Sequence, residues 1–182
     1  RYFGTFDLTK KGKNLGRGVE MAAGILSSYD RRVSNMLLGG WKVSICSNLQ
    51  YTGDLLAMGR HTRHVMDRLP GKILNAAQSF DDYVDRQRTH IEWMRDTTIS
   101  VPEAYHHMVL LARQGVMCWS DVGRVSHIFD TDDRWGAKPT LWRLANSVTA
   151  ILQPKLLEKN GASYSEKTCR LNDHILSIAK AA

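Results

Sequence analysis

The spacing of apolar residues changes once along this chain, near residue 65, and that change limits the folds that the chain can adopt. Before residue 65, apolar and polar residues alternate in short runs, which is the period of a β-strand. After it, apolar residues recur every three or four positions, which is the period of an amphipathic helix. The sequence therefore predicts an α+β fold, with a small antiparallel sheet and β-hairpins in the first third, followed by a long helix and a helical C-terminal part.

The chain is expected to form a single domain over residues 1–182, with a basic β-rich part at 1–64 and a helical part at 65–182. Its hydrophobic content of 43% is sufficient for a buried core. No apolar run reaches the length of a membrane span, so we expect no membrane association. Three widely spaced cysteines argue against a disulfide framework and favour a reducing, cytoplasmic setting. The chain begins at Arg1, so further residues are expected upstream.

Strand signals cover most of the first sixty residues. Residues 2–8 are predicted to form a strand. Residues 19–28 are compatible with a helix or a strand, and Gly24 within the run favours the strand. Two further apolar-rich runs, 32–38 and 41–47, are separated by Gly39-Gly40. Because two consecutive glycines accept positive φ values, this pair predicts the turn of a β-hairpin.

Five helices are predicted after residue 65. The first is a long amphipathic helix from about Pro70 to Asp96. Ser100, followed by a proline and a glutamate, is typical of a helix N-cap, and Thr140 is expected to cap a later helix in the same way. The remaining predicted helices extend from about 100 to 114, from 120 to 129, from Thr140 to Leu152 before Pro154, and from 163 to 182.

Basic charge is concentrated in the β-rich part. Residues 1–64 carry ten Lys and Arg against four acids, whereas the rest of the chain carries fifteen against fourteen. A localised positive field attracts polyanions, of which a phosphate backbone is the commonest. The alternative is an ordinary basic surface without a specific ligand.

The predicted nucleic-acid site combines cations that hold phosphates with aromatic rings that support unstacked bases. Arg60 and Arg63, at the junction with the long helix, are expected to make the strongest phosphate contact; the alternative is a solvated loop. Trp41 lies on the apolar side of its run and is expected in the core. The predicted binding residues are Lys10, Lys11, Lys13, Arg17, Arg31, Arg32, Lys42, Arg60, Arg63, Tyr29 and Tyr51.

Patterns typical of catalysis are missing from the sequence. It contains no nucleophile elbow, P-loop or dinucleotide fingerprint. The close histidine pairs, His61/His64 and His106/His107, lack a third ligand at a diagnostic spacing. The aspartates of loop 130–133 suggest a divalent-cation loop, but the EF-hand pattern is absent and a solvated acidic loop is favoured. We therefore expect no enzyme activity, no metal and no cofactor.

Three stretches carry a family resemblance. They are 26–30 (LSSYD), 43–48 (VSICSN) with Arg60-His61-Thr62 after it, and 140–149 (TLWRLANSVT). In this order they resemble the phage- and plasmid-associated domain-of-unknown-function family 932, over roughly residues 19–152. The resemblance implies association with mobile elements and a link to replication or recombination. It offers no catalytic residues to transfer to this chain.

The predicted function is sequence-independent binding of single-stranded DNA in phage or mobile-element replication and recombination, with strand annealing as a further expectation. Phage single-strand-annealing recombinases of the Red-beta and ERF type are similar in architecture only. By that analogy the partner is single-stranded DNA and the protein is a homo-oligomer, either a ring or a filament. The alternative is a non-catalytic interaction or virion-assembly protein whose helical half docks a partner.

Overall fold

The computed structural model describes most of the helical part and the strands of the β-rich part. Backbone is described for residues 2–7, 18–27, 35–43, 48–59, 68, 71–72, 74–75, 80–156 and 161–181. Side chains are described for residues 18–20, 37, 39–41, 68, 71–72, 74–75, 82–154 and 163–178.

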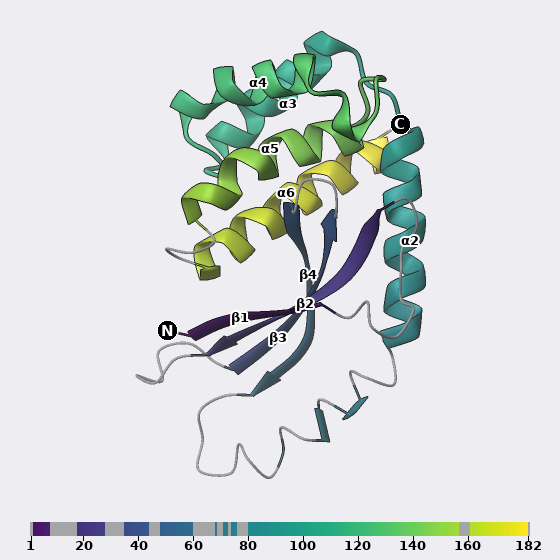
Figure 1. Cartoon of the computed structure of the whole chain (residues 1–182), viewed down its shortest axis with the longest axis vertical. Helices are drawn as coiled ribbons and strands as arrows, with labels where there is room; N and C mark the ends of the chain where they lie inside the picture. Colours follow the sequence, from purple (N-terminus) through teal and green to yellow (C-terminus); the bar gives the residue numbers. More distant parts are fainter. Residues whose placement is uncertain are drawn as a thin grey trace.

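Four strands form one antiparallel sheet in the order in which they occur along the chain (Figure 1). They are β1 (Tyr2–Asp7), β2 (Val19–Ser27), β3 (Asn35–Val43) and β4 (Asn48–Gly59). Each strand pairs with the next, so the sheet consists of successive antiparallel neighbours. A sheet at the N-terminal end followed by helices gives an α+β arrangement.

The predicted hairpin turn at Gly39-Gly40 is wrong, because β3 continues through both glycines. Gly39 pairs with Ala23 and Gly40 with Ala22, in an unbroken ladder with β2. A Cβ atom built on Gly39 would lie 2.5 Å from Cζ and 2.8 Å from Cε1 of Tyr83. A glycine inside a strand often marks such a close approach by another part of the chain. The pair therefore permits helix-to-sheet contact, and β3 is joined to β4 through residues 44–47, outside the described part.

Five α-helices and two short 3₁₀ segments follow the sheet among the described residues. The predicted long helix from Pro70 is described as a helix only from Phe80, with isolated helical positions at 68, 71–72 and 74–75 and residues 76–79 outside the described part. Pro154 does not end its helix as predicted; proline removes one backbone donor in the last turn, and the helix continues to Leu156. The elements are α2 (Phe80–Asp96), α3 (Val101–Arg113), η2 (Trp119–Asp121), α4 (Val122–Thr131), η3 (Asp133–Trp135), α5 (Leu141–Leu156) and α6 (Gly161–Ala181).

Both predicted helix caps are confirmed. Oγ of Ser100 accepts a hydrogen bond from the backbone N–H of Glu103, whose carboxylate accepts one from the Ser100 N–H at 2.8 Å. This reciprocal capping box satisfies donors that the first turn of α3 leaves without partners. Thr140 Oγ1 accepts from the backbone N–H of Arg143 at 3.2 Å and caps α5 in the same way.

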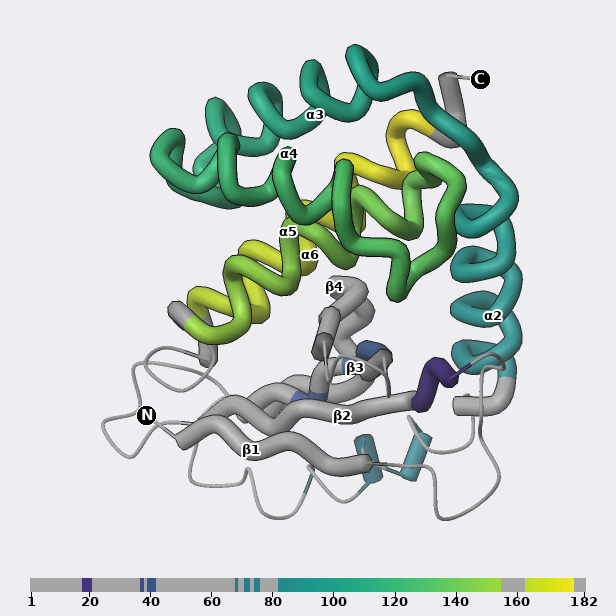
Figure 2. The backbone as a smooth tube through the Cα atoms, turned by 45° about the horizontal axis from the view of Figure 1, so that its top comes forward, coloured from purple at the N-terminus to yellow at the C-terminus, as the bar shows by residue number. Residues whose placement is uncertain are grey.

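Helices α2 to α6 lie on one side of the sheet, whereas the short helical pieces at 68, 71–72 and 74–75 lie on the other (Figure 2). β4 contacts α5 and α6, and α2 contacts α5 and reaches the sheet through Tyr83. Val19 and Trp41 contribute fully buried side chains from the sheet to a core that continues through the helices. Within the described part, no helix has both the length and the apolar character needed to span a lipid bilayer.

Candidate nucleic-acid interface and the helical surface

Most of the predicted binding residues lie outside the described part of the chain. Only Lys42 in β3 and Tyr51 in β4 belong to described strands, and their side chains are not among those described. The prediction that Arg60 and Arg63 form the strongest phosphate contact concerns undescribed residues. The same is true of the lysines of the 10–13 run, of Arg17, Arg31 and Arg32, and of Tyr29.

The strand register brings positions 42 and 51 together. Tyr51 pairs with Gly40, and Lys42 pairs with Leu49. Positions 42 and 51 are therefore diagonal neighbours across β3 and β4, a relation that long and aromatic side chains can bridge. On its other side, Lys42 pairs with Glu20 of β2, which is half-buried. The structure thus places one predicted cation and one predicted aromatic residue in adjacent strands, with a carboxylate opposite the cation.

Trp41 is confirmed as a core residue. Its side chain is fully buried, and its ring contacts that of His90 in α2 edge-on, with centroids 6.0 Å apart and an interplanar angle of 83°. Successive strand positions alternate between the faces of a sheet, so positions 40 and 42 belong to the face opposite the one that α2 covers. Trp41 therefore cannot serve as a stacking platform for bases.

An open groove of about 720 Å³ runs beside α2. Its wall includes Trp93, whose ring stacks on that of His90 with centroids 5.9 Å apart, and Leu176 of α6. Asp82, Asp85 and Arg86 give the groove mixed charge. Two carboxylates repel phosphate, so this groove does not extend the predicted nucleic-acid site. The sequence places these charged residues on the outer face of a helix but does not indicate that Leu176 of α6 also lines the groove.

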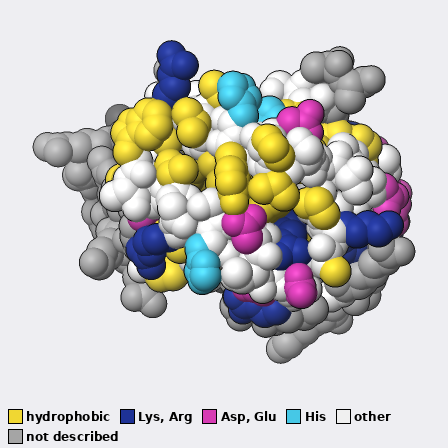
Figure 3. Space-filling view, turned by 90° about the horizontal axis from the view of Figure 1, so that it is seen from above, with side chains coloured by type: hydrophobic (Ala, Val, Ile, Leu, Met, Phe, Trp, Pro, Cys, Tyr) yellow, Lys and Arg dark blue, Asp and Glu magenta, His cyan; other side chains and the backbone are white. Residues whose placement is uncertain are grey.

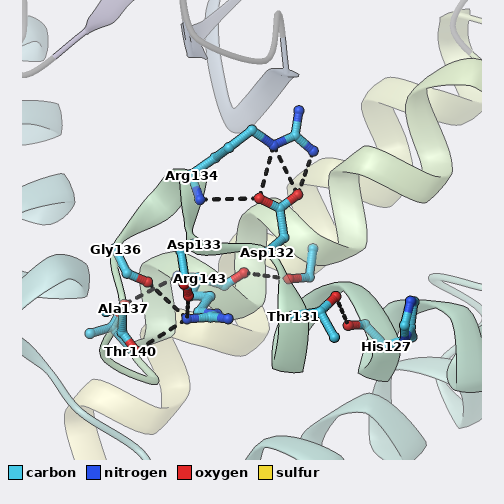
Figure 4. Close-up of polar contacts among 10 residues, drawn as sticks. His127, Thr131, Asp132, Asp133, Arg134, Gly136, Ala137, Thr140 and Arg143 are labelled. Carbon is cyan, nitrogen blue, oxygen red and sulfur yellow. Dashed lines mark hydrogen bonds and ion pairs between the residues drawn. The ribbon is translucent and has the colours of Figure 1, made fainter.

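The predicted acidic loop at 130–133 is instead the junction between the end of α4 and the start of η3, where arginines hold Asp132 and Asp133 (Figure 4). Arg143, which is almost fully buried, donates from Nη1 to Oδ1 of Asp133 at 3.0 Å and to the carbonyl oxygens of Gly136 at 2.9 Å and Ala137 at 3.2 Å. Hydrogen bonds from Arg134 lower the pKa of the Asp132 carboxyl. Asp132 and Asp133 therefore have cationic partners within the protein, so their carboxylates stabilise the fold.

Two histidines from distant parts of the sequence meet between α3 and α6. Nδ1 of His107 lies 3.1 Å from Nε2 of His174, and Nε2 of Gln114 lies 3.5 Å from Nδ1 of His174. Burial lowers the pKa of both imidazoles, and neighbouring histidines lower it further. The sequence shows His106 and His107 as a pair, but only the fold supplies His174. Among the described residues, no cluster of three or more metal-ligating side chains forms.

No protein-family model, curated protein or solved structure matches this chain. The resemblance to family 932 therefore depends on the order of its motifs alone.

Proposed function

We propose that this protein is a non-catalytic binder of single-stranded nucleic acid, which it holds through the β-rich part without sequence preference. The observation that carries the proposal is the diagonal relation of Lys42 and Tyr51 in adjacent strands. Their positions lie on the sheet face opposite the one where α2 covers Trp41. A cation and an aromatic ring at this spacing suit one nucleotide, with its phosphate on the lysine and its base on the tyrosine.

The charge distribution supports the same surface. Residues 1–64 carry nearly all of the excess positive charge of a chain whose net charge is +7. The described helical surface carries mixed charge, as the groove beside α2 shows. A nucleic-acid strand is therefore attracted to the β-rich part. The affinity falls as the salt concentration rises, because the release of counterions on binding is then less favourable.

Lys42 and Tyr51 supply matched variants for the test. Lys42→Ala should weaken binding of all single strands alike and lower the salt slope by about 0.7, the value for one phosphate contact. Tyr51→Ala should weaken binding by about 1–3 kcal/mol, the usual contribution of one stacked base, and Tyr51→Phe should retain most of it. Lys138→Ala is the control, because it removes one positive charge from an exposed loop in the helical part.

Glu20 gives a variant that changes affinity in the opposite direction. Glu20 is the residue opposite Lys42 in the ladder of β2 and β3, and a carboxylate at that position competes with phosphate for a neighbouring cation. Glu20→Gln should therefore raise affinity while Lys42→Ala lowers it. The measurement is fluorescence anisotropy of labelled oligothymidylate between about 50 and 200 mM salt. The proposal fails if wild type shows no binding at the lower salt, or if Lys42→Ala and Lys138→Ala behave alike.

Strand annealing in phage or mobile-element replication and recombination is a narrower form of this proposal and depends on the family resemblance. Mixing complementary labelled strands with the protein tests it, since an annealing protein accelerates duplex formation above the rate for the strands alone. A second candidate function, docking of a partner by the helical half, is favoured by an exposed apolar face on α3.

A further inference from the structure

An apolar surface lies on the helical half, on the side away from the sheet. Its apolar part consists of Val101, Tyr105 and Val109 of α3 and Trp119 of η2, and Asp130 of α4 borders it; we call it the α3–α4 face. The exposed fraction is 38–40% for the three α3 side chains and 60% for Trp119. Figure 3 shows hydrophobic side chains gathered on this side of the molecule, bordered by charged residues and histidines. Large apolar side chains clustered at a surface are typical of an interaction site.

The exposed stripe lies beside the side of α3 that packs into the core. Core packing uses Ala104, Met108, Leu111 and Ala112. The exposed residues follow each other at intervals of four, so they form one line along the flank of the helix. Oη of Tyr105 donates to Oδ2 of Asp130 at 2.5 Å, which shows that this flank borders α4. A capping box stabilises the N-terminal end of α3, so the stripe lies on a regular helix from its first turn.

Charge is distributed unevenly along this face. The Tyr105–Asp130 hydrogen bond joins the N-terminal half of α3 to the C-terminal end of α4, so the two helices run antiparallel. Asp130 therefore lies toward one end of the face. Arg113 continues the line of Val101, Tyr105 and Val109 at the same interval of four and lies toward the other end. Both charged residues are exposed. The face thus has an acidic end, an apolar middle and a basic end.

We propose that the α3–α4 face binds a second copy of this chain in a two-fold symmetric dimer. In such an interface the same patch meets itself in the reverse direction. The acidic end of one copy then lies against the basic end of the other, twice, while the apolar middle parts are buried together. Tyr105 and Trp119 are the expected anchors, since aromatic residues carry much of the energy of interfaces. The interface lies away from the sheet and is independent of the proposed function.

Sedimentation equilibrium of the full chain, without nucleic acid, measures the association. Wild type should shift from monomer to dimer as concentration rises. Trp119→Ser should raise the dimer dissociation constant by about tenfold or more, the effect of losing one interface anchor. Leu74→Ser is the control, because Leu74 is also 60% exposed but is not part of the α3–α4 face. Thermal unfolding of each variant tests that the fold is retained.

A charge exchange identifies the partner as a second copy. Asp130→Lys makes both ends of the face basic, and Arg113→Glu makes the basic end acidic, so each variant alone should dimerise less than wild type. A mixture of the two variants should form a heterodimer, because each mutated end then meets an end of opposite charge. The proposal is overturned if wild type stays monomeric at all concentrations, if both single variants dimerise as wild type does, or if the mixture forms no heterodimer.

Discussion

Replacing Gly39 by alanine tests whether the contact between α2 and β3 fixes the sheet to the helices. The new Cβ would lie 2.5 Å from Cζ of Tyr83 and 2.8 Å from Cε1, and closer still to Oη. Carbon atoms in contact are normally about 3.5–4.0 Å apart, so the overlap is about 1 Å. Tyr83 is only 2% exposed, and its ring cannot move into solvent without leaving the core. Either the ring or the helix must move.

Overpacking of this kind costs about 1–3 kcal/mol, and here we expect the upper end of that range because the clash involves a rigid ring. For a chain of this size the melting temperature should fall by about 4–10 °C. The assay is urea unfolding, monitored by tryptophan fluorescence. The midpoint reports the change in stability if the dependence of the unfolding free energy on urea concentration is the same as in wild type. Gly123→Ala is the matched control, since nothing lies within 4 Å of its added Cβ and α4 is helical there. That control should be neutral or stabilising by up to about 1 kcal/mol.

A double-mutant cycle attributes the loss to Tyr83. In a Tyr83→Leu background the shorter side chain leaves room at Gly39, so Gly39→Ala should cost at least about 1 kcal/mol less than in wild type. If Gly39→Ala is as stable as wild type, or if its cost is the same in both backgrounds, then close approach of Tyr83 is not the reason for glycine in β3.

Arg143→Met should lower the free energy of unfolding by about 1.5–3 kcal/mol, because it removes charged hydrogen bonds to Asp133 and to two loop carbonyls. Thermal unfolding measures the loss. Arg88→Met is the control, because it removes an exposed ion pair with Asp85 and should change stability by at most about 1 kcal/mol. The free energy of unfolding should also decrease as the pH is lowered from about 6.5 to the pKa values of His107 and His174 in the folded protein, which are lowered. In this range the two histidines bind protons in the unfolded chain but not in the folded protein. Urea unfolding at several pH values should show a smaller slope over that range for His174→Gln, and an unchanged slope would refute this assignment.

Local signals in the sequence determined the parts of the fold that depend on neighbouring residues. A cap needs only residues within one helical turn, so Ser100 and Thr140 were predicted correctly as the starts of α3 and α5. Alternation along one strand was enough to assign Trp41 to the core. The position of a helix end does not follow from a local signal alone, because a proline in the last turn weakens a helix without fixing where it stops, as Pro154 in α5 shows.

Tertiary structure alone decided the features that join distant residues. Gly39-Gly40 has the composition of a turn, and only the position of Tyr83 explains why the pair lies inside a strand. His107 and His174 are 67 residues apart, and no short-range pattern indicates that their rings meet. The same holds for the α3–α4 face, whose opposite charges belong to two helices that become antiparallel neighbours only on folding. Periodicity determines which side of an element is apolar, but long-range packing decides which of those apolar sides is buried and which stays at the surface.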